Sequence, residues 1–105
     1  MDKLQIVAEP RRREILRLVW DEELPAGEIA SHFDVGFGAV SQHLGVLRDA
    51  GFVRMRREGK RRYYKANFDG LGQLKEMLEE MWSEHLDRLA LLAEQVDREK
   101  IEVRP

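Results

Sequence analysis

The sequence predicts a mainly helical domain that carries one small β-hairpin, and three patterns support this fold class. Apolar residues recur at helical spacing through residues 37–50. Two alternating runs, Phe52–Arg57 and Arg61–Ala66, flank a short segment that contains Gly59. The last third of the chain then carries a long helical stripe of apolar residues. A chain of 105 residues has the length of one domain.

Residues 1–33 predict three short helices. Residues 3–8 form a short apolar segment of helical character. Pro10 suits the first turn of a second helix, because a helix start leaves that N–H unpaired in any case. One face of this helix gathers Arg12, Ile15, Leu16 and Val19. Leu24-Pro25 marks a boundary, and a third helix is expected over Ala26–Phe33.

A longer helix is expected over Phe37–Ala50, after a tight connector at Asp34-Val35-Gly36. Val40, Leu44 and Leu47 follow at helical spacing and should form its buried face. Gly51 supplies the stop, since glycine readily adopts the left-handed conformation that ends many helices. Two short helices joined by a tight turn with a glycine form a helix-turn-helix. With the hairpin as its wing, the predicted fold class is a winged helix-turn-helix.

The hairpin should turn at Glu58-Gly59-Lys60, with Gly59 free to take a positive φ. Tyr63 and Tyr64 point to opposite sides of their strand, so one of them is expected in the core. Asp69-Gly70 should open the last helix, whose apolar stripe runs from Leu71 to Val96. We therefore expect one domain over residues 1–96, dimerising through its terminal helices, and a charged, frayed tail over residues 97–105.

Charge is distributed unevenly along the chain. Residues 1–68 hold 13 basic and 10 acidic side chains, and residues 69–105 hold 5 and 10, although the net charge is only −2. The chain has no cysteine, which excludes disulfides and thiolate metal sites. No apolar run reaches the ~20 residues of a membrane span. These features predict a soluble, cytoplasmic protein with a polyanionic partner.

The second helix of a helix-turn-helix enters the DNA major groove with its outward side chains. On the helix expected over Phe37–Ala50, the outward positions are Phe37, Ser41, Gln42, Gly45 and Arg48. Gln42 can pair with adenine through two hydrogen bonds, Ser41 can serve bases or phosphates, and Phe37 can contact a thymine methyl. Gly45 permits a close approach.

The hairpin adds a dense run of cations directly after this helix. Between Arg48 and Lys65 there are eight Lys or Arg against two acids. The hairpin cations are Arg54, Arg56, Arg57, Lys60, Arg61, Arg62 and Lys65. A charge run is usually a solvated face, but this run is one-signed and follows a candidate recognition helix. Its position therefore favours contact with DNA phosphates.

At this point the sequence resembles the ArsR-type winged-helix repressors over nearly its full length. The resemblance is carried by Glu9-Pro10-Arg11-Arg12-Arg13-Glu14-Ile15-Leu16, Gly27-Glu28-Ile29-Ala30, Ala39-Val40-Ser41-Gln42-His43-Leu44, Val46-Leu47-Arg48-Asp49-Ala50-Gly51-Phe52-Val53 and Arg57-Glu58-Gly59-Lys60-Arg61-Arg62-Tyr63-Tyr64. It implies a homodimeric repressor that binds double-stranded DNA at an imperfect palindromic operator. It also implies that Ser41, Gln42 and His43 lie in the recognition helix and that Arg56 to Arg62 form the wing. Gly36-Phe37-Gly38 departs from the family, which usually has Ser or Thr here.

The apolar stripe of the last helix is too broad for so small a domain to cover alone. We expect it to pair with a second copy, with the N-terminal segment joining. The expected interface residues are Leu4, Val7, Leu74, Leu78, Met81, Trp82, His85, Leu89 and Leu92.

Metal-dependent and enzymatic functions have little support in the sequence. His85, with Asp87 and Glu94 near it, lacks the second histidine that a site on this helix would need. Ser41 and His43 point in different directions on a helix, so they cannot form a nucleophile–base pair. Glu22-Glu23 and Glu79-Glu80 are interpreted as solvated faces. We therefore expect no enzyme activity and no cofactor.

Two alternatives to a simple repressor or autorepressor remain at this stage. One is a repressor that responds to a metal through ligands other than cysteine, or to a small molecule. The other is a protein-interaction module that has kept the fold and lost DNA binding, which Gly36-Phe37-Gly38 keeps open.

Overall fold

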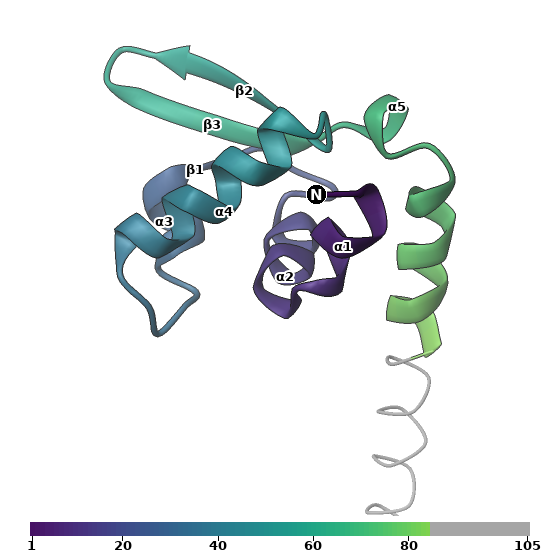
Figure 1. The fold of residues 1–105 in the computed structure, drawn as a ribbon. Coiled ribbons are helices and arrows are strands. Elements are labelled where there is room, and N and C mark those ends of the chain that lie inside the picture. The colour runs from purple at the N-terminus through teal and green to yellow at the C-terminus, as the bar shows by residue number, and fades with distance from the viewer. Residues whose placement is uncertain (85–105) are drawn as a thin grey trace, which may run out of the picture. The chain divides into compact units, whose positions relative to one another are not determined.

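The computed structural model describes residues 1–84, which belong to two compact units divided after Gly72. The described part of the second unit, residues 73–84, is helical. The first unit contains five helices and three strands in its chain order (Figure 1): α1 (Lys3–Ala8), α2 (Pro10–Leu18), β1 (Leu24–Pro25), α3 (Ala26–Ala30), α4 (Phe37–Asp49), β2 (Val53–Glu58), β3 (Arg61–Ala66) and α5 (Phe68–Leu71).

The first two helices form where the sequence predicts them. Asp2 and Gln5 make a reciprocal capping box at the start of α1, and Glu9 caps α2 by accepting from the Arg12 N–H at 3.1 Å. Because Pro10 prevents α1 from continuing, its last carbonyls need other donors. Arg12 Nε donates to the Ile6 carbonyl at 2.7 Å, and this arginine is buried on the core face as expected.

The helix-turn-helix is formed by α3 and α4, and α3 is shorter than expected. It ends at Ala30 rather than Phe33. The Ser31 hydroxyl donates to the Glu28 carbonyl at 2.6 Å, and the His32 N–H donates three residues back to Ile29. These local bonds form a tight turn and engage the carbonyl groups that a longer α-helix would use for its own hydrogen bonds.

The C-terminal end of α4 confirms the predicted glycine stop. Gly51 has a φ of +81°, and its N–H donates to the Arg48 carbonyl at 2.9 Å. The Phe52 N–H donates to the Leu47 carbonyl, also at 2.9 Å. This pair of bonds is a Schellman motif, and its apolar partners, Leu47 and Phe52, are both fully buried.

The sheet contains the predicted hairpin and one strand that the sequence did not predict. Gly59 has a φ of +61° in the turn that joins β2 and β3. On the other edge of β3, Leu24 pairs with Tyr64 and Pro25 with Tyr63, which gives the strand order β1-β3-β2. Leu24-Pro25 is thus an edge strand, a position that proline tolerates. The fold is the predicted winged helix-turn-helix.

The core of the first unit lies where the two helix pairs and the sheet meet. Its fully buried side chains come from α2, α3, α4, α5 and the segments that follow α2 and α4: Ile15, Leu16, Val19, Ile29, Val40, Leu44, Leu47, Phe52 and Leu71. Of the two tyrosines, Tyr64 is buried and Tyr63 is half-buried, as the alternation predicts.

The expectation of one helix opening at Asp69-Gly70 is wrong. The chain forms the short helix α5, leaves the helical conformation at Gly72 with a φ of +57°, and resumes a helix at residue 73. A residue with a positive φ cannot continue a right-handed helix, so α5 ends before Gly72. The expected tail, residues 97–105, and the end of the stripe lie outside the described residues.

Glycine at position 70 is required by a close backbone contact. A Cβ built on Gly70 would lie 1.7 Å from the Gly51 carbonyl oxygen, which also accepts a hydrogen bond from Asn67 Nδ2 at 3.0 Å. This contact joins the end of α4 to the segment that follows β3.

We predict that Gly70→Ala destabilises the fold by on the order of 3 kcal/mol, because backbone atoms must move to admit the methyl group. The midpoint of urea denaturation measures this change. Gly27→Ala is the matched control, since no atom lies within 4 Å of the added Cβ on α3. It should be neutral or stabilising, and equal effects of the two variants would contradict the packing argument.

Candidate nucleic-acid interface

The register of the hairpin distributes its charged side chains over two faces. Cross-strand partners share a face, and the faces alternate along each strand. Met55 pairs with the buried Tyr64, and two residues toward the tip Arg57 pairs with Arg62 on that same face. The opposite face carries the pairs Arg54–Lys65, Arg56–Tyr63 and Glu58–Arg61. Two arginines therefore face each other directly across the strands near the tip.

Two cations at the base of the hairpin are occupied by polar groups from elsewhere in the chain. Arg54 Nε donates to Asn67 Oδ1 at 3.1 Å, and Nη2 lies 3.6 Å from Asp69 Oδ2. Lys65 Nζ donates to the Trp20 carbonyl at 2.8 Å. These two residues pair with each other across the strands, so the contacts relieve a like-charge pair.

A third cation, Arg56, is held by two carboxylates. Its Nε donates to both carboxylate oxygens of Glu23, at 2.8 and 2.9 Å, and its Nη2 lies 2.6 Å from Glu23 Oε1. Its Nη1 donates to Glu58 at 3.0 Å, and its Cζ lies 4.5 Å from the centre of the Tyr63 ring. The hydrogen bonds to Glu23 and then to Glu58 raise the pKa of Arg56 above its ordinary value.

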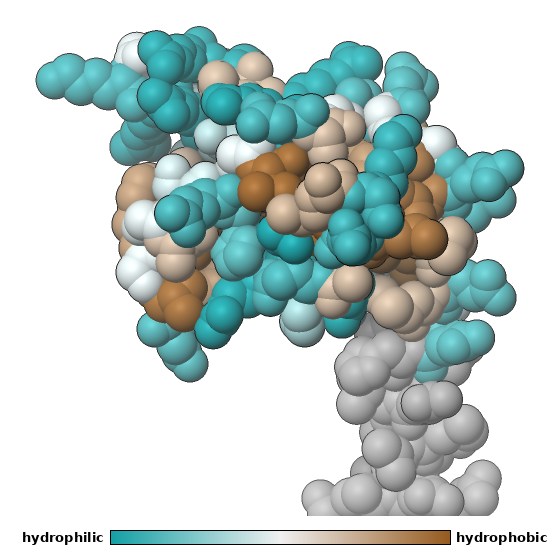
Figure 2. Space-filling model, viewed as in Figure 1, coloured by the Kyte–Doolittle hydropathy of each residue, from teal (hydrophilic) through white to brown (hydrophobic). Residues whose placement is uncertain are grey.

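The four cations nearest the tip are different. Within residues 1–84, no ion pair or side-chain hydrogen bond engages Arg57, Lys60, Arg61 or Arg62, and all four are exposed. Figure 2 shows hydrophilic side chains gathered over the hairpin. The positive charge of the hairpin is thus concentrated at its tip, where it is available to an external anion.

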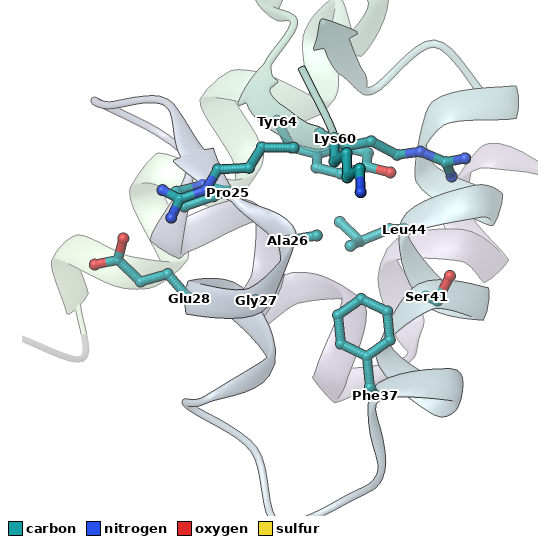
Figure 3. A pocket seen from close by; sticks show the side chains of 11 residues that line it. Pro25, Ala26, Gly27, Glu28, Phe37, Ser41, Leu44, Lys60 and Tyr64 are labelled. Atoms are coloured by element: carbon teal, nitrogen blue, oxygen red, sulfur yellow. The ribbon is translucent and has the colours of Figure 1, made fainter. Parts of the chain in front are cut away.

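A groove of about 710 Å³ separates the tip from the helix-turn-helix. Its walls come from the start of α3, one side of α4 and the hairpin (Figure 3): Pro25, Ala26, Gly27, Glu28, Phe37, Ser41, Leu44, Lys60, Arg61, Arg62 and Tyr64. Figure 3 shows the Phe37 ring and the Ser41 hydroxyl on the α4 side, across the space from Lys60. The groove therefore combines an apolar aromatic wall with cations that have no ion pair in the described part of the chain.

The outward ridge of α4 carries one long polar side chain between two glycines. Gln42 is exposed, and positions four residues before it and three residues after it are Gly38 and Gly45. Both glycines have open space where a Cβ would stand. Residues at these spacings share a helix face. The backbone of α4 can therefore approach a flat partner closely around Gln42.

Phe37 and Gly36 define the start of α4. Phe37 is 58% exposed, and Gly36 occupies the N-cap position with no side-chain hydrogen bond to the helix. The absence of a Ser or Thr hydroxyl leaves the first N–H groups of α4 without a side-chain cap.

The structure separates the remaining predicted DNA-facing residues. His43 is turned toward α2, with Nε2 3.7 Å from Glu9 Oε2, and its side chain is only 20% exposed. This contact would give His43 a structural role within the fold, in place of the DNA-facing one that the resemblance implies. Arg48 is exposed and lies 3.6 Å from its neighbour Asp49, a surface pair of little energetic weight.

Glu23 is a residue of the site that the sequence did not predict. Glu22-Glu23 was expected to be a solvated face, but Glu23 binds Arg56, which lies 33 positions later in the chain. No local pattern reports a contact over that distance. The unpredicted strand β1 is the feature that brings Glu23 beside the hairpin. Glu79 also has a partner, Lys75 at 3.1 Å.

Burial divides the residues predicted for a dimer interface. Leu4 is 61% exposed and Met81 is 40% exposed, whereas Val7, Leu74 and Leu78 are buried. Trp82 is half-buried. Met77, which is 56% exposed, was not among the predicted interface residues. The predicted interface residues His85, Leu89 and Leu92 lie outside the described residues.

Two further properties of the described residues bear on other functions. Among residues 1–84, no cluster of three His, Asp or Glu side chains is arranged to hold a metal ion. In the same part of the chain, no helix combines the length and apolar character needed to cross a membrane.

Comparisons with known proteins agree with the observed fold. The family model for bacterial regulatory proteins of the arsR family matches residues 9–55. The transcriptional activator HlyU of Vibrio cholerae is 33% identical over 75% of this chain and 73% of its own. The transcriptional repressor SdpR of Bacillus subtilis is 36% identical over 58% of this chain and 68% of its own.

A solved structure extends the likeness to three dimensions. It is the homodimeric winged helix-turn-helix DNA-binding domain of a possible ArsR-family transcriptional regulator from Mycobacterium bovis. It superposes with a TM-score of 0.65 at 31% identity and covers 78% of this chain and 76% of that one. The family consists of transcriptional regulators rather than enzymes. The chain described here belongs to the arsR family of bacterial regulatory proteins.

Proposed function

We propose that this protein is a homodimeric repressor that binds a palindromic DNA operator in the cytoplasm, with α4 in the major groove and the wing tip on the backbone. The observation that carries the proposal is the set of tip cations Arg57, Lys60, Arg61 and Arg62, which have no ion pair within residues 1–84 and lie beside the exposed side of α4. A cluster of uncompensated cations attracts the phosphates of a duplex.

The pairing of Arg57 with Arg62 strengthens the case for an anionic partner. Like charges directly opposite each other in a hairpin are destabilising. The other like-charge pair of this hairpin, Arg54 and Lys65, is relieved by groups within the chain. A DNA phosphate that approached the Arg57–Arg62 pair would relieve the remaining repulsion and gain charge-assisted hydrogen bonds.

The α4 surface supports base reading next to this phosphate contact. Gln42 can donate to and accept from adenine, while Ser41 and Phe37, on the groove side of the helix, can serve a phosphate and a thymine methyl. Arg48 is exposed at the other end of the helix for the DNA backbone. Glu28 also lines the groove and would repel a phosphate that came too close to α3.

Dimerisation supplies the second half of the recognition surface. The exposed apolar residues Leu4, Met77 and Met81 favour burial against a second copy, as does the homodimeric state of the Mycobacterium bovis relative. A two-fold dimer would place its recognition helices about 34 Å apart, one turn of DNA, which corresponds to a palindromic operator. The direction of regulation follows the repressor SdpR, although the relative HlyU is an activator.

The first prediction concerns salt. On an operator isolated by selection of bound genomic fragments, log K against log[salt] should fall by about 0.9 per phosphate contact. Arg61→Ala/Arg62→Ala should make this slope less steep by roughly one to two units, because a complex with fewer phosphate contacts releases fewer counterions. Fluorescence anisotropy titrations at several salt concentrations measure the slope.

The control for this prediction is Arg11→Ala/Arg17→Ala, which removes the same charge from exposed positions of α2. The control should leave the slope nearly unchanged. Equal slopes for the two double variants would refute phosphate binding by the wing tip, and absence of wild-type binding to any duplex at low salt would refute the proposed function.

The second prediction concerns base preference. Gln42→Ala should reduce the discrimination against substituted base pairs at one position per half-site by roughly 1–3 kcal/mol, because bidentate pairing with a base edge is lost. Binding to unrelated DNA should stay the same. Competition titrations with single-base operator variants measure the discrimination, with Gln73→Ala as a control on an exposed glutamine outside the winged helix.

The third prediction concerns Gly45, which lies three residues after Gln42. Gly45→Ala should stabilise the free protein by about 1 kcal/mol, because alanine is the better helix former and the site has open space. It should nevertheless weaken operator binding several-fold, because the methyl group separates α4 from the base edges. Urea denaturation and anisotropy measure the two effects. A variant that binds as tightly as the wild type would show that α4 does not approach DNA on this ridge.

A further inference from the structure

We infer that Arg56 is a positioning residue of the wing rather than a phosphate ligand, and that Glu23 is its essential partner. The inference rests on the proposed DNA binding and assigns roles within it. Arg56 belongs to the cationic hairpin and was predicted to contact DNA. Its guanidinium is instead occupied on one edge by Glu23 and on the other by Glu58, with Tyr63 beneath.

The Glu23–Arg56 contact connects the two outer strands of the sheet. Glu23 directly precedes β1, and Arg56 belongs to β2, while β3 lies between these strands. Arg56 pairs with Tyr63, which in turn pairs with Pro25 on the other side. The ion pair therefore passes over the Tyr63 ring and joins the edges of the sheet across its middle strand.

This connection determines where the hairpin points. The strands β2 and β3 extend beyond β1, which pairs with Tyr63 and Tyr64 in the middle of β3. Glu23 holds Arg56 at the level of the last β1 pair, close to where the free part of the hairpin begins. A bidentate arginine–carboxylate contact has a fixed planar geometry, so it restrains twisting as well as separation. Loss of this contact would allow the tip to move relative to α4.

Arg56 has a second effect, on the charge of the tip. Glu58 pairs across the strands with Arg61, the opposite-charge partner that would normally neutralise it. The Glu58 carboxylate instead binds Arg56 Nη1 at 3.0 Å, and Arg61 has no ion pair within the described residues. Arg56 thus occupies two acids close to the wing and leaves the tip cations uncompensated.

The test uses the sign of an electrostatic effect. Glu23→Gln removes a negative charge near the DNA, and long-range electrostatics alone would make operator binding tighter. If Glu23 positions the wing, operator binding should instead weaken, by roughly three- to tenfold. Glu22→Gln is the matched control: the adjacent glutamate is exposed and has no partner within residues 1–84, so its replacement should leave binding unchanged or tighten it slightly.

Arg56→Lys completes the test because it preserves the charge and removes the planar fork. Lysine can still contact a phosphate as a point charge, but it cannot form the planar contact with both carboxylate oxygens of Glu23. We expect Arg56→Lys to weaken binding about as much as Glu23→Gln and to keep the wild-type slope of log K against log[salt]. The double variant should be no weaker than either single variant, because both remove the same contact.

The outcomes separate the inference from the proposed function. Tighter binding by Glu23→Gln, unchanged binding by Arg56→Lys, or additive losses in the double variant would overturn the positioning role while leaving DNA binding intact. Failure of the wild-type protein to bind any duplex would overturn the proposed function itself. Urea denaturation of each variant should show that its fold is retained, since both side chains are partly exposed.

Discussion

The pairing of β3 with a strand on each side is the constraint on which the rest of the candidate interface depends. The β1 strand holds the base of β3 against the helix-turn-helix through Leu24 and Pro25, and β2 forms the free hairpin on the other edge. This arrangement fixes which hairpin cations lie near carboxylates and carbonyls and which extend beyond them. The division between a paired base and an unpaired tip follows directly from it.

Charge pairing divides the wing into two regions, one whose cations make contacts within the chain and one whose cations do not. At the base, Arg56 and Lys65 make contacts within the chain that hold the hairpin in place. At the tip, Arg57 and Arg62 face each other without a counter-ion in the described part of the chain. Folding therefore leaves a local repulsion that no group within residues 1–84 relieves. A polyanion is the partner whose arrival would lower that energy, which ties the stability of the wing to binding.

The helix α4 shows a comparable compromise between stability and close approach by a partner. Gly38 and Gly45 lower the helix propensity of α4, and Gly36 provides no side-chain cap. The burial of Val40, Leu44 and Leu47 offsets these costs, so tertiary packing rather than local propensity maintains the helix. The open ridge that results exposes Gln42 between two positions without side chains.

The sequence by itself determined the approximate positions of α1 to α4 and of the hairpin, because helical spacing, Pro10, Gly51 and Gly59 act on the local backbone. Its motifs also indicated the family. It also placed Phe37, Ser41 and Gln42 on the exposed side of one helix. The tertiary structure alone decided that Leu24-Pro25 forms a strand, that α5 ends at Leu71, and that Glu23 binds Arg56. These features depend on backbone breaks and on contacts between distant segments. A run of positive charges in a sequence does not show which cations form an ion pair with a carboxylate.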